Sequence, residues 1–110
     1  MIEIPPFQDF MDPILQVLKE RDGPASNEEL MRQVPERMNL SAEQRAVERR
    51  RPGSTTTEVA YRIGWAKSYL KKAGLIANTG RSEWSITQAG VRAGRIDGTA
   101  VARESRRKKT

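Results

Sequence analysis

A row of aromatic, hydroxyl and cationic side chains at helical spacing is the part of this sequence best suited to binding a ligand. Tyr61, Trp65, Ser68 and Lys72 recur at intervals of three and four residues, so one face of a helix would carry all four. Cations on such a face pair with phosphate groups, and aromatic rings stack on bases or contact methyl groups. These residue types therefore favour a nucleic-acid surface over a catalytic centre.

Enzyme chemistry has few candidate residues in this chain. The sequence contains no cysteine and no histidine. The chain therefore cannot form disulfides or thiolate sites, and it lacks histidine, the commonest metal ligand and the commonest general base. Because the carboxylates form no clustered triad either, we expect no catalytic residue, no metal site and no cofactor.

The polar face belongs to a predicted helix and hairpin over residues 55–86. Thr55 and Glu58 have capping-box spacing, and Gly74 is a typical residue just past a helix end. Between them an apolar stripe recurs at helical period: Val59, Ile63, Ala66, Leu70 and Ala73. Residues 75–78 and 82–86 then predict two strands joined by a turn at 79–81. A helix followed by such a hairpin is the second half of a winged helix-turn-helix.

Two earlier helices are predicted to complete the core. After the extended residues 1–6, an apolar face from Phe7 to Leu18 predicts a helix that ends near Arg21; at Asp12-Pro13 this helix either restarts or kinks. A second capping box opens a helix at Ser26, and we expect Pro35 to break that helix. A short helix over 41–48 leads to the arginine loop, residues 49–54, which is either a solubilising linker or a phosphate-contacting segment.

The end of the chain is weakly apolar and basic. Thr87 can cap a last, glycine-rich helix, and residues 99–110 predict a basic disordered tail. Charge is divided along the sequence, since residues 1–44 hold 4 basic and 9 acidic groups (net −5) and residues 45–110 hold 16 and 5 (net +11), which sum to +6. This asymmetry favours contact of the second half with a polyanion.

The helix–hairpin segment also carries a family resemblance. The segment RIGWAKSYLKKAGLI from Arg62 to Ile76 resembles the hallmark of the N-terminal domain of Mrr-type restriction endonucleases. The segments WSITQAG from Trp84, IPPF from Ile4 and MDPIL from Met11 are similar to the same domain's closing strand and opening helix. The resemblance covers roughly residues 4–94, and the arginine loop departs from it.

The resemblance implies a winged helix that binds DNA ahead of a separate nuclease domain, in a family that acts on modified, typically methylated, DNA. A metal-dependent nuclease of that kind needs an Asp followed at a distance by an acidic or Gln residue, one further position and a Lys. No such triplet follows Asp97. We therefore expect the DNA-reading part of a restriction system without cleavage chemistry.

The predicted DNA contacts lie on the third helix, the hairpin tip and the arginine loop. Residues early in the helix are expected to approach base edges, and lysines and Arg81 to hold phosphates. For Trp65, packing against the arginine loop or the second helix is favoured over stacking on a base. The predicted set is Thr56, Thr57, Tyr61, Arg62, Trp65, Lys67, Ser68, Lys71, Lys72, Arg81, Arg49, Arg50 and Arg51.

The sequence thus predicts a mainly α (α+β) winged helix-turn-helix, with three to four helices and a two-stranded β wing. Residues 1–98 would form the DNA-binding domain and 99–110 the tail. Its expected partner is double-stranded DNA, possibly methylated. A stand-alone transcriptional regulator and a winged helix that binds a partner protein are the alternatives. With no signal-peptide pattern and no long apolar run, we expect a cytoplasmic protein. Because the glycine-spaced last helix offers little apolar area for pairing, we expect a monomer or a weak homodimer.

Overall fold

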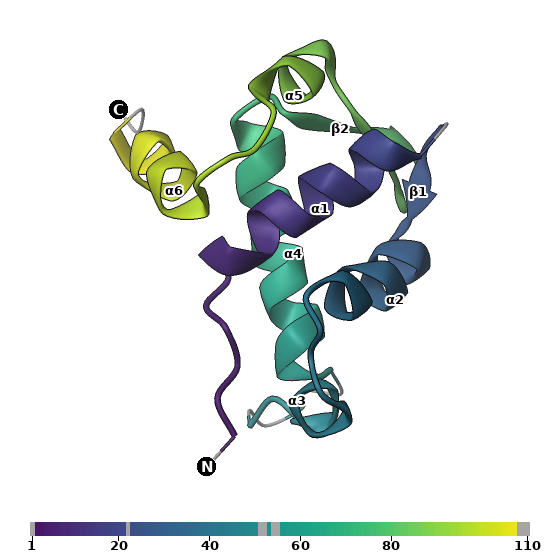
Figure 1. Ribbon diagram of the computed structural model, residues 1–110, viewed down its shortest axis with the longest axis vertical. Coiled ribbons are helices and arrows are strands. Elements are labelled where there is room, and N and C mark those ends of the chain that lie inside the picture. Colours follow the sequence, from purple (N-terminus) through teal and green to yellow (C-terminus); the bar gives the residue numbers. More distant parts are fainter. Residues whose placement is uncertain (1, 22, 51–52, 54–55, 108–110) are drawn as a thin grey trace.

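The computed structural model describes residues 2–21, 23–50, 53 and 56–107. Along the chain its elements are α1 (Gln8–Glu20), β1 (Ala25–Ser26), α2 (Asn27–Arg37), α3 (Ala42–Ala46), α4 (Glu58–Lys72), β2 (Ile76–Gly80), β3 (Glu83–Ile86), α5 (Gln88–Ala93) and α6 (Gly98–Arg107). Helix α1 crosses over the middle of α4, with α2 and β1 on one side and α6 on the other (Figure 1).

A small antiparallel sheet closes one end of this arrangement. Its strand order is β1–β3–β2, with Ala25 opposite Trp84 and Ile76 opposite Ile86. The order helix, short strand, two or more helices and hairpin is that of a winged helix. The α+β winged-helix-like fold is therefore confirmed, with strand β1 as an addition that the sequence did not predict.

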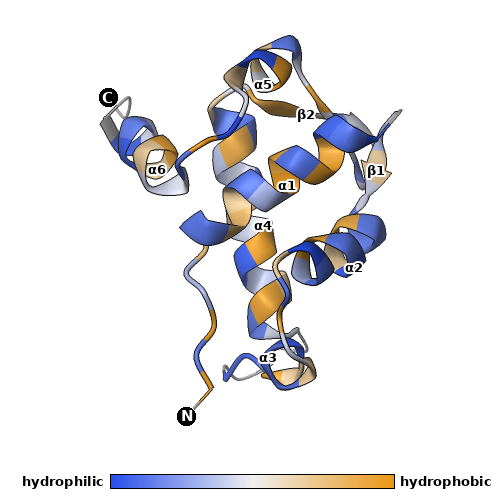
Figure 2. Ribbon diagram, viewed as in Figure 1, coloured by the Kyte–Doolittle hydropathy of each residue, from blue (hydrophilic) through white to orange (hydrophobic). Residues whose placement is uncertain are grey.

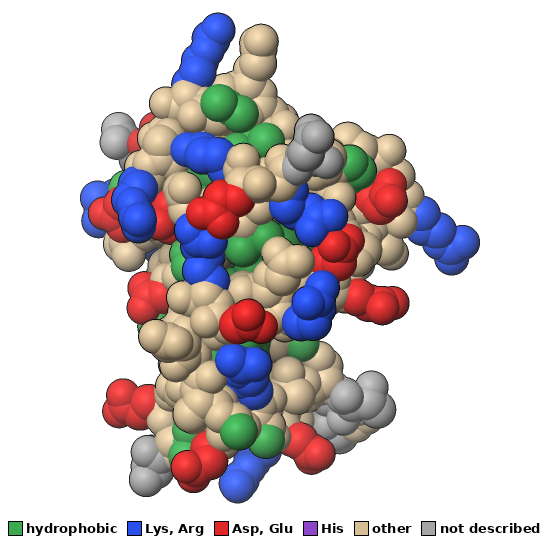
Figure 3. Space-filling model, turned by 45° about the vertical axis from the view of Figure 1, so that its right-hand side comes forward, with side chains coloured by type: hydrophobic (Ala, Val, Ile, Leu, Met, Phe, Trp, Pro, Cys, Tyr) green, Lys and Arg blue, Asp and Glu red, His purple; other side chains and the backbone are tan. Residues whose placement is uncertain are grey.

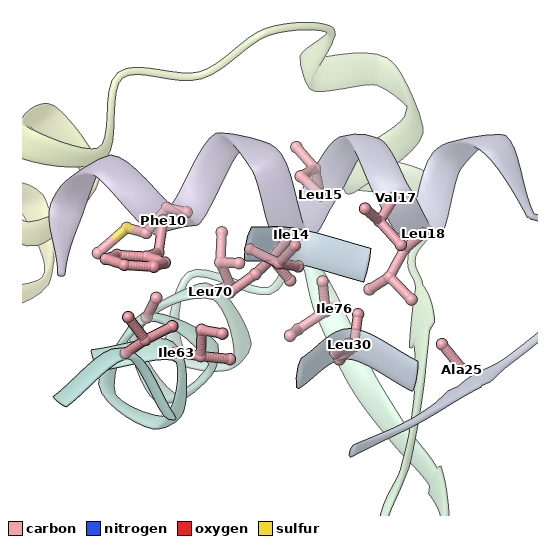
Figure 4. Close-up of a cluster of buried hydrophobic side chains, with 14 of the residues drawn as sticks. Phe10, Ile14, Leu15, Val17, Leu18, Ala25, Leu30, Ile63, Leu70 and Ile76 are labelled. Carbon is pink, nitrogen blue, oxygen red and sulfur yellow. The ribbon is translucent and has the colours of Figure 1, made fainter. Parts of the chain in front are cut away.

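The core forms where α1, α2 and α4 meet. Phe10, Ile14, Leu30, Ile63 and Leu70 have no exposed surface, and their side chains point toward one another in Figure 4. Polar and apolar residues alternate along α1, α2 and α4 (Figure 2), and the residues that these helices bury are mainly the apolar ones. Helix α4 is thereby fixed in rotation about its own axis, because turning it would expose Ile63 and Leu70.

Two predicted helix boundaries change in the structure, and the alternative left open at Pro13 is decided in favour of one helix. The N-cap of α4 is Thr57, whose hydroxyl accepts a hydrogen bond from the amide of Ala60 at 3.1 Å; the predicted cap Thr55 lies outside the described residues. Pro13 lies inside a continuous α1. Pro35 also lies inside α2 rather than breaking it. Pro35 is buried, as Leu30 and Val34 are, and its burial offsets the backbone hydrogen bond that proline cannot donate.

The predicted disorder of the tail is wrong for residues 99–107. These residues belong to α6, which packs on α1 and α4 with Ala102 and Ser105 buried. Gly98 lies so close to α1 that a Cβ there would stand 1.9 Å from the carbonyl oxygen of Gln8. Small residues on this face of α6 supply close backbone approach in place of large apolar side chains, so low hydropathy did not prevent docking. Residues 108–110 lie outside the described part.

Asp12 of α1 holds the segment that leads into α6. Its carboxylate accepts hydrogen bonds from the amide of Ile96 and the side chain of Gln16, both at 3.0 Å. Gln16 and Lys19 also donate to the carbonyl of Gly94, at 3.0 and 3.1 Å. Polar side chains of α1 therefore fix the position of the segment between α5 and α6.

Candidate nucleic-acid interface

The face of α4 opposite the core carries the residues that the sequence singled out. Ser68 and Lys72 are exposed, Tyr61 is partly exposed, and Trp65 is 47% exposed. The favoured prediction that Trp65 would be buried is therefore wrong. Its ring lies on the outer surface of α4, in contact with Tyr61, whose ring is covered by the guanidinium of Arg49.

Aromatic rings form a continuous row along this face. Phe7 stacks on Tyr69 with ring centres 5.0 Å apart, Tyr69 lies 6.3 Å from Trp65, and Trp65 meets Tyr61 edge-on at 6.2 Å. The guanidinium of Arg49 covers the far side of Tyr61 at 3.3 Å. Each ring is held by its neighbours, so the row presents a rigid surface.

The carboxylate of Glu58, at the start of α4, pairs with two of the arginines that the sequence predicted as DNA contacts. Glu58 accepts from Arg62 Nε at 3.1 Å and pairs with Arg49 at 3.4 Å. Arg62 also donates to the carbonyls of Ile4 and Pro5, at 2.7 and 2.9 Å. Arg62 thus holds the N-terminal segment against α4, and its guanidinium is engaged within the protein.

Backbone hydrogen bonds join the start of the arginine loop to the residues at the start of α4. The amide of Arg49 donates to the carbonyl of Thr56 at 3.1 Å, and the amide of Glu58 donates to Val47 at 2.9 Å. Thr57 is the helix cap and is partly buried. Arg50 is exposed beside this junction, and Arg51 lies outside the described residues.

Two hollows flank the wall formed by Tyr61 and Trp65. The first, of about 500 Å³, lies toward the N-terminal segment and is lined by Pro6, Phe7, Arg49, Glu58, Tyr61, Arg62, Trp65 and Tyr69. The second, of about 440 Å³, lies on the outer surface of α4 and is lined by Thr56, Ala60, Tyr61, Gly64, Trp65 and Ser68. We call the second one the Gly64 hollow.

Lys67, which the sequence predicted to hold a phosphate, does not lie on the exposed surface of α4. The side chain is buried, and its ammonium donates to Asn27 Oδ1 at 2.6 Å. Trp84 Nε1 donates to the same oxygen at 2.7 Å. Burial lowers the pKa of the Lys67 ammonium. This set of three residues, the Asn27 joint, connects α2, α4 and β3.

The joint depends on Asn27, which sequence reasoning did not single out. Its position directly after the helix cap Ser26 suggested only a first-turn residue, and no local pattern indicates that its side chain accepts from two distant donors. The adjoining amide of Asn27 donates to the carbonyl of Ser82 at 2.9 Å. One residue therefore secures both α4 and the wing to α2.

Exposed cations lie in the turn of the wing and, separately, in the last turn of α4. Arg81 is exposed in the turn between β2 and β3, and Lys72 is exposed in the last turn of α4. Lys71 reaches from α4 to Asn78 of β2, with Nζ 3.0 Å from Oδ1. The helix and the wing thus each present basic groups to solvent.

The opposite side of the molecule has a different charge pattern. The face over α2 and β1 interleaves basic and acidic side chains (Figure 3). Ion pairs Arg21–Glu29 and Arg37–Glu20 lie on this side. The backbone amide of the cap residue Ser26 holds the pKa of Glu29 below its usual range. The guanidinium of Arg37 does the same for the pKa of Glu20. A surface of mixed sign attracts a polyanion less than a surface of one sign.

Within the described residues, no cluster of three or more acidic side chains is positioned to hold a metal ion. No helix in that part of the chain is long and apolar enough to cross a membrane.

Comparisons with known proteins place this chain in a family. Residues 7–95 match the model of the Mrr N-terminal domain. Over 89 residues the chain is 29% identical to the type IV methyl-directed restriction enzyme EcoKMrr of Escherichia coli K12. That alignment covers 79% of this chain and 28% of the relative, so the chain spans just over a quarter of the relative's length. No solved structure matches the chain. Because the family model covers most of the sequence, this chain belongs to the Mrr N-terminal domain family, a domain of restriction systems.

Proposed function

We propose that this chain binds duplex DNA through the outer face of α4 and the β2–β3 wing, as the DNA-reading part of a restriction system. The observation that carries the proposal is the outer face of α4, which presents Trp65, Ser68 and Lys72 in a winged-helix-like fold. A helix of this kind fits the major groove, where side chains reach base edges.

Charge and geometry support the same face. Lys72 is exposed in the last turn of the helix, and Arg81 is exposed in the turn of the wing. If α4 lies in the major groove, the wing follows the neighbouring backbone, where an arginine pairs with phosphate or enters a narrow minor groove. The second half of the sequence, with a net charge of +11, contains both elements.

The relative supports a role in reading DNA modification. EcoKMrr is described as methyl-directed, and this chain matches its family's N-terminal domain. We propose a binding role for the matched residues, with a methylated base as the feature that is recognised. Catalysis is not part of this proposal.

Salt-dependent binding to a duplex pool tests the proposal. Fluorescence anisotropy with a 30-base-pair duplex of randomised sequence should show an affinity that falls steeply between 50 and 200 mM salt. Arg81→Ala and Lys72→Ala should each lower the slope of log K against log salt by about one unit. Arg32→Ala, an exposed cation on the α2 face, serves as the matched control and should leave the slope unchanged.

A second candidate function is binding of a partner protein through the aromatic row. The 47% exposure of Trp65 beside a cleft of about 500 Å³ favours it, since aromatic anchors dominate many protein interfaces. Weak, salt-insensitive binding to DNA, unchanged in the Arg81 and Lys72 variants, would support this function and contradict the first.

A further inference from the structure

We infer that Asn27 is a positioning residue for DNA binding: its side-chain oxygen fixes the wing relative to α4, so that Arg81 meets a phosphate when α4 lies in the groove. The inference rests on the proposed function, because it requires α4 and the wing to contact one duplex. Asn27 acts through Lys67 and Trp84 and itself contacts no DNA.

The Oδ1 atom of Asn27 accepts hydrogen bonds from two different elements. Lys67 Nζ of α4 donates to it at 2.6 Å, and Trp84 Nε1 of β3 donates at 2.7 Å. The Lys67 side chain is buried, and Trp84 is partly buried against the core. The Lys67 ammonium also lies 5.2 Å from the centre of the Trp84 ring. One oxygen of α2 therefore joins the middle of α4 to the wing.

The backbone of Asn27 extends this joint to the turn of the wing. Its amide donates to the carbonyl of Ser82 at 2.9 Å, and Ser26 pairs with Glu83 in the sheet. Ser82 has a φ of 59°, in the left-handed region that tight turns use. Arg81 directly precedes Ser82. The backbone that carries this cation is therefore anchored one residue away.

The buried joint holds the wing more firmly than the exposed contact between α4 and the wing does. One turn after Lys67, Lys71 reaches Asn78 Oδ1 at 3.0 Å, and both of these side chains are exposed. Water competes for exposed polar groups, whereas a buried hydrogen bond has no such competitor. The joint at Asn27 therefore has the larger effect on the angle between the wing and the helix.

This angle matters because the spacing between groove and backbone in a duplex is set by the duplex. With α4 in the major groove, the wing must present Arg81 at the neighbouring phosphates. A wing that is already fixed loses little freedom on binding, and a wing that is free to move loses more. We therefore expect the phosphate contact of Arg81 to depend on Asn27.

Two variants each cut one hydrogen bond of the joint. Trp84→Phe removes the Nε1 donor and keeps an aromatic ring. Lys67→Met removes the ammonium and keeps the aliphatic stem, and it keeps the fold stable because it also removes a buried charge. In the salt titration with the randomised duplex, each variant should lower the slope of log K against log salt by about one unit, as Arg81→Ala does.

Double variants separate positioning from a general loss of binding. In the Trp84→Phe background, Arg81→Ala should lower the slope no further, because its phosphate contact is already lost. Lys72→Ala lies on α4 itself and is the control. In the same background it should still lower the slope by about one unit.

Substitutions at Asn27 provide a rescue test. Asn27→Ala leaves both donors without their acceptor, and we expect a lower melting temperature and a lower slope. Asn27→Asp keeps an oxygen that accepts from both donors, so it should keep the wild-type slope. Binding is measured below the onset of melting of every variant, where a change in stability alone leaves the affinity unchanged. If Asn27→Ala does not fold, Trp84→Phe and Lys67→Met carry the test.

The outcomes distinguish this inference from the proposed function. A wild-type slope in both Trp84→Phe and Lys67→Met, with a lowered slope in Arg81→Ala, would overturn the inference and leave DNA binding standing. A further loss of one unit when Arg81→Ala is added to Trp84→Phe would also overturn it. Salt-insensitive binding by the wild type, or no binding, would overturn the proposed function and the inference together.

Discussion

The guanidinium carbon of Arg49 lies 3.3 Å from the centre of the Tyr61 ring. The same guanidinium pairs with Glu58, one turn earlier in α4, and the Arg49 side chain is only 13% exposed. From the sequence, the arginine loop was equally consistent with a linker and with phosphate contacts. Arg49, the first arginine of the loop, instead packs on Tyr61 of the candidate interface and is engaged within the protein.

Arg49→Ala is therefore expected to destabilise the fold by about 1–2 kcal/mol, because it removes a cation–π contact and one partner of a poorly exposed carboxylate. Arg49→Lys should restore little, since an ammonium cannot both lie flat on the ring and reach Glu58. Urea denaturation measures both effects. Arg50→Ala, at the exposed neighbouring position, is the control and should change stability by less than about 0.5 kcal/mol.

Arg62→Ala should also act on stability rather than on base recognition. Its guanidinium holds the carbonyls of Ile4 and Pro5 as well as Glu58, so its loss should free the N-terminal segment. We expect faster amide hydrogen exchange in residues 2–7 and a loss of about 1–3 kcal/mol. Loss of discrimination between DNA sequences without any change in exchange would contradict this assignment and support the base contact that the sequence predicted.

Lys67→Met tests the charge buried in the Asn27 joint. Because burial lowers the pKa of Lys67, the protonated form costs free energy in the folded state. Met keeps the aliphatic stem, and Asn27 keeps its bond from Trp84, so Lys67→Met should be at least as stable as the wild type at pH 7.

The pH dependence of that comparison has a definite sign. Between the lowered pKa and the ordinary value near 10.5, the unfolded chain binds a proton that the folded chain releases. Stability of the wild type relative to Lys67→Met should therefore rise as the pH increases through this window. Urea titrations of both proteins at pH 7 and pH 10 measure the difference, and a gap that stays constant or widens would refute the assignment.

Gly98→Ala should detach α6 from α1. The added methyl would stand 1.9 Å from the carbonyl oxygen of Gln8, a backbone atom that cannot move aside cheaply. We expect a loss of about 1–3 kcal/mol and faster hydrogen exchange in residues 98–107, although Ala is the better helix former. Thr99→Ala, exposed in the same turn, is the control and should leave exchange in α6 unchanged.

Much of α4 was determined by the sequence alone. The recurrence of Val59, Ile63 and Leu70 at helical period required one buried stripe, and that stripe placed Tyr61 and Ser68 on the opposite face. Capping residues and Gly74 located the helix ends to within a few residues. These features are local, since they depend on side chains within a few turns of one another.

Only the tertiary structure decided which polar groups remain available on that helix. Lys67 and Arg62 read as surface cations in the sequence, yet one is bound to Asn27, 40 residues earlier, and the other to Ile4, 58 residues earlier. Helix α6 docks through Gly98, Ala102 and Ser105, small residues that give only a weak hydrophobic signal. Such contacts join segments far apart in the chain, so no periodicity within a single helix encodes them; they follow from how α1, α2 and α4 cross.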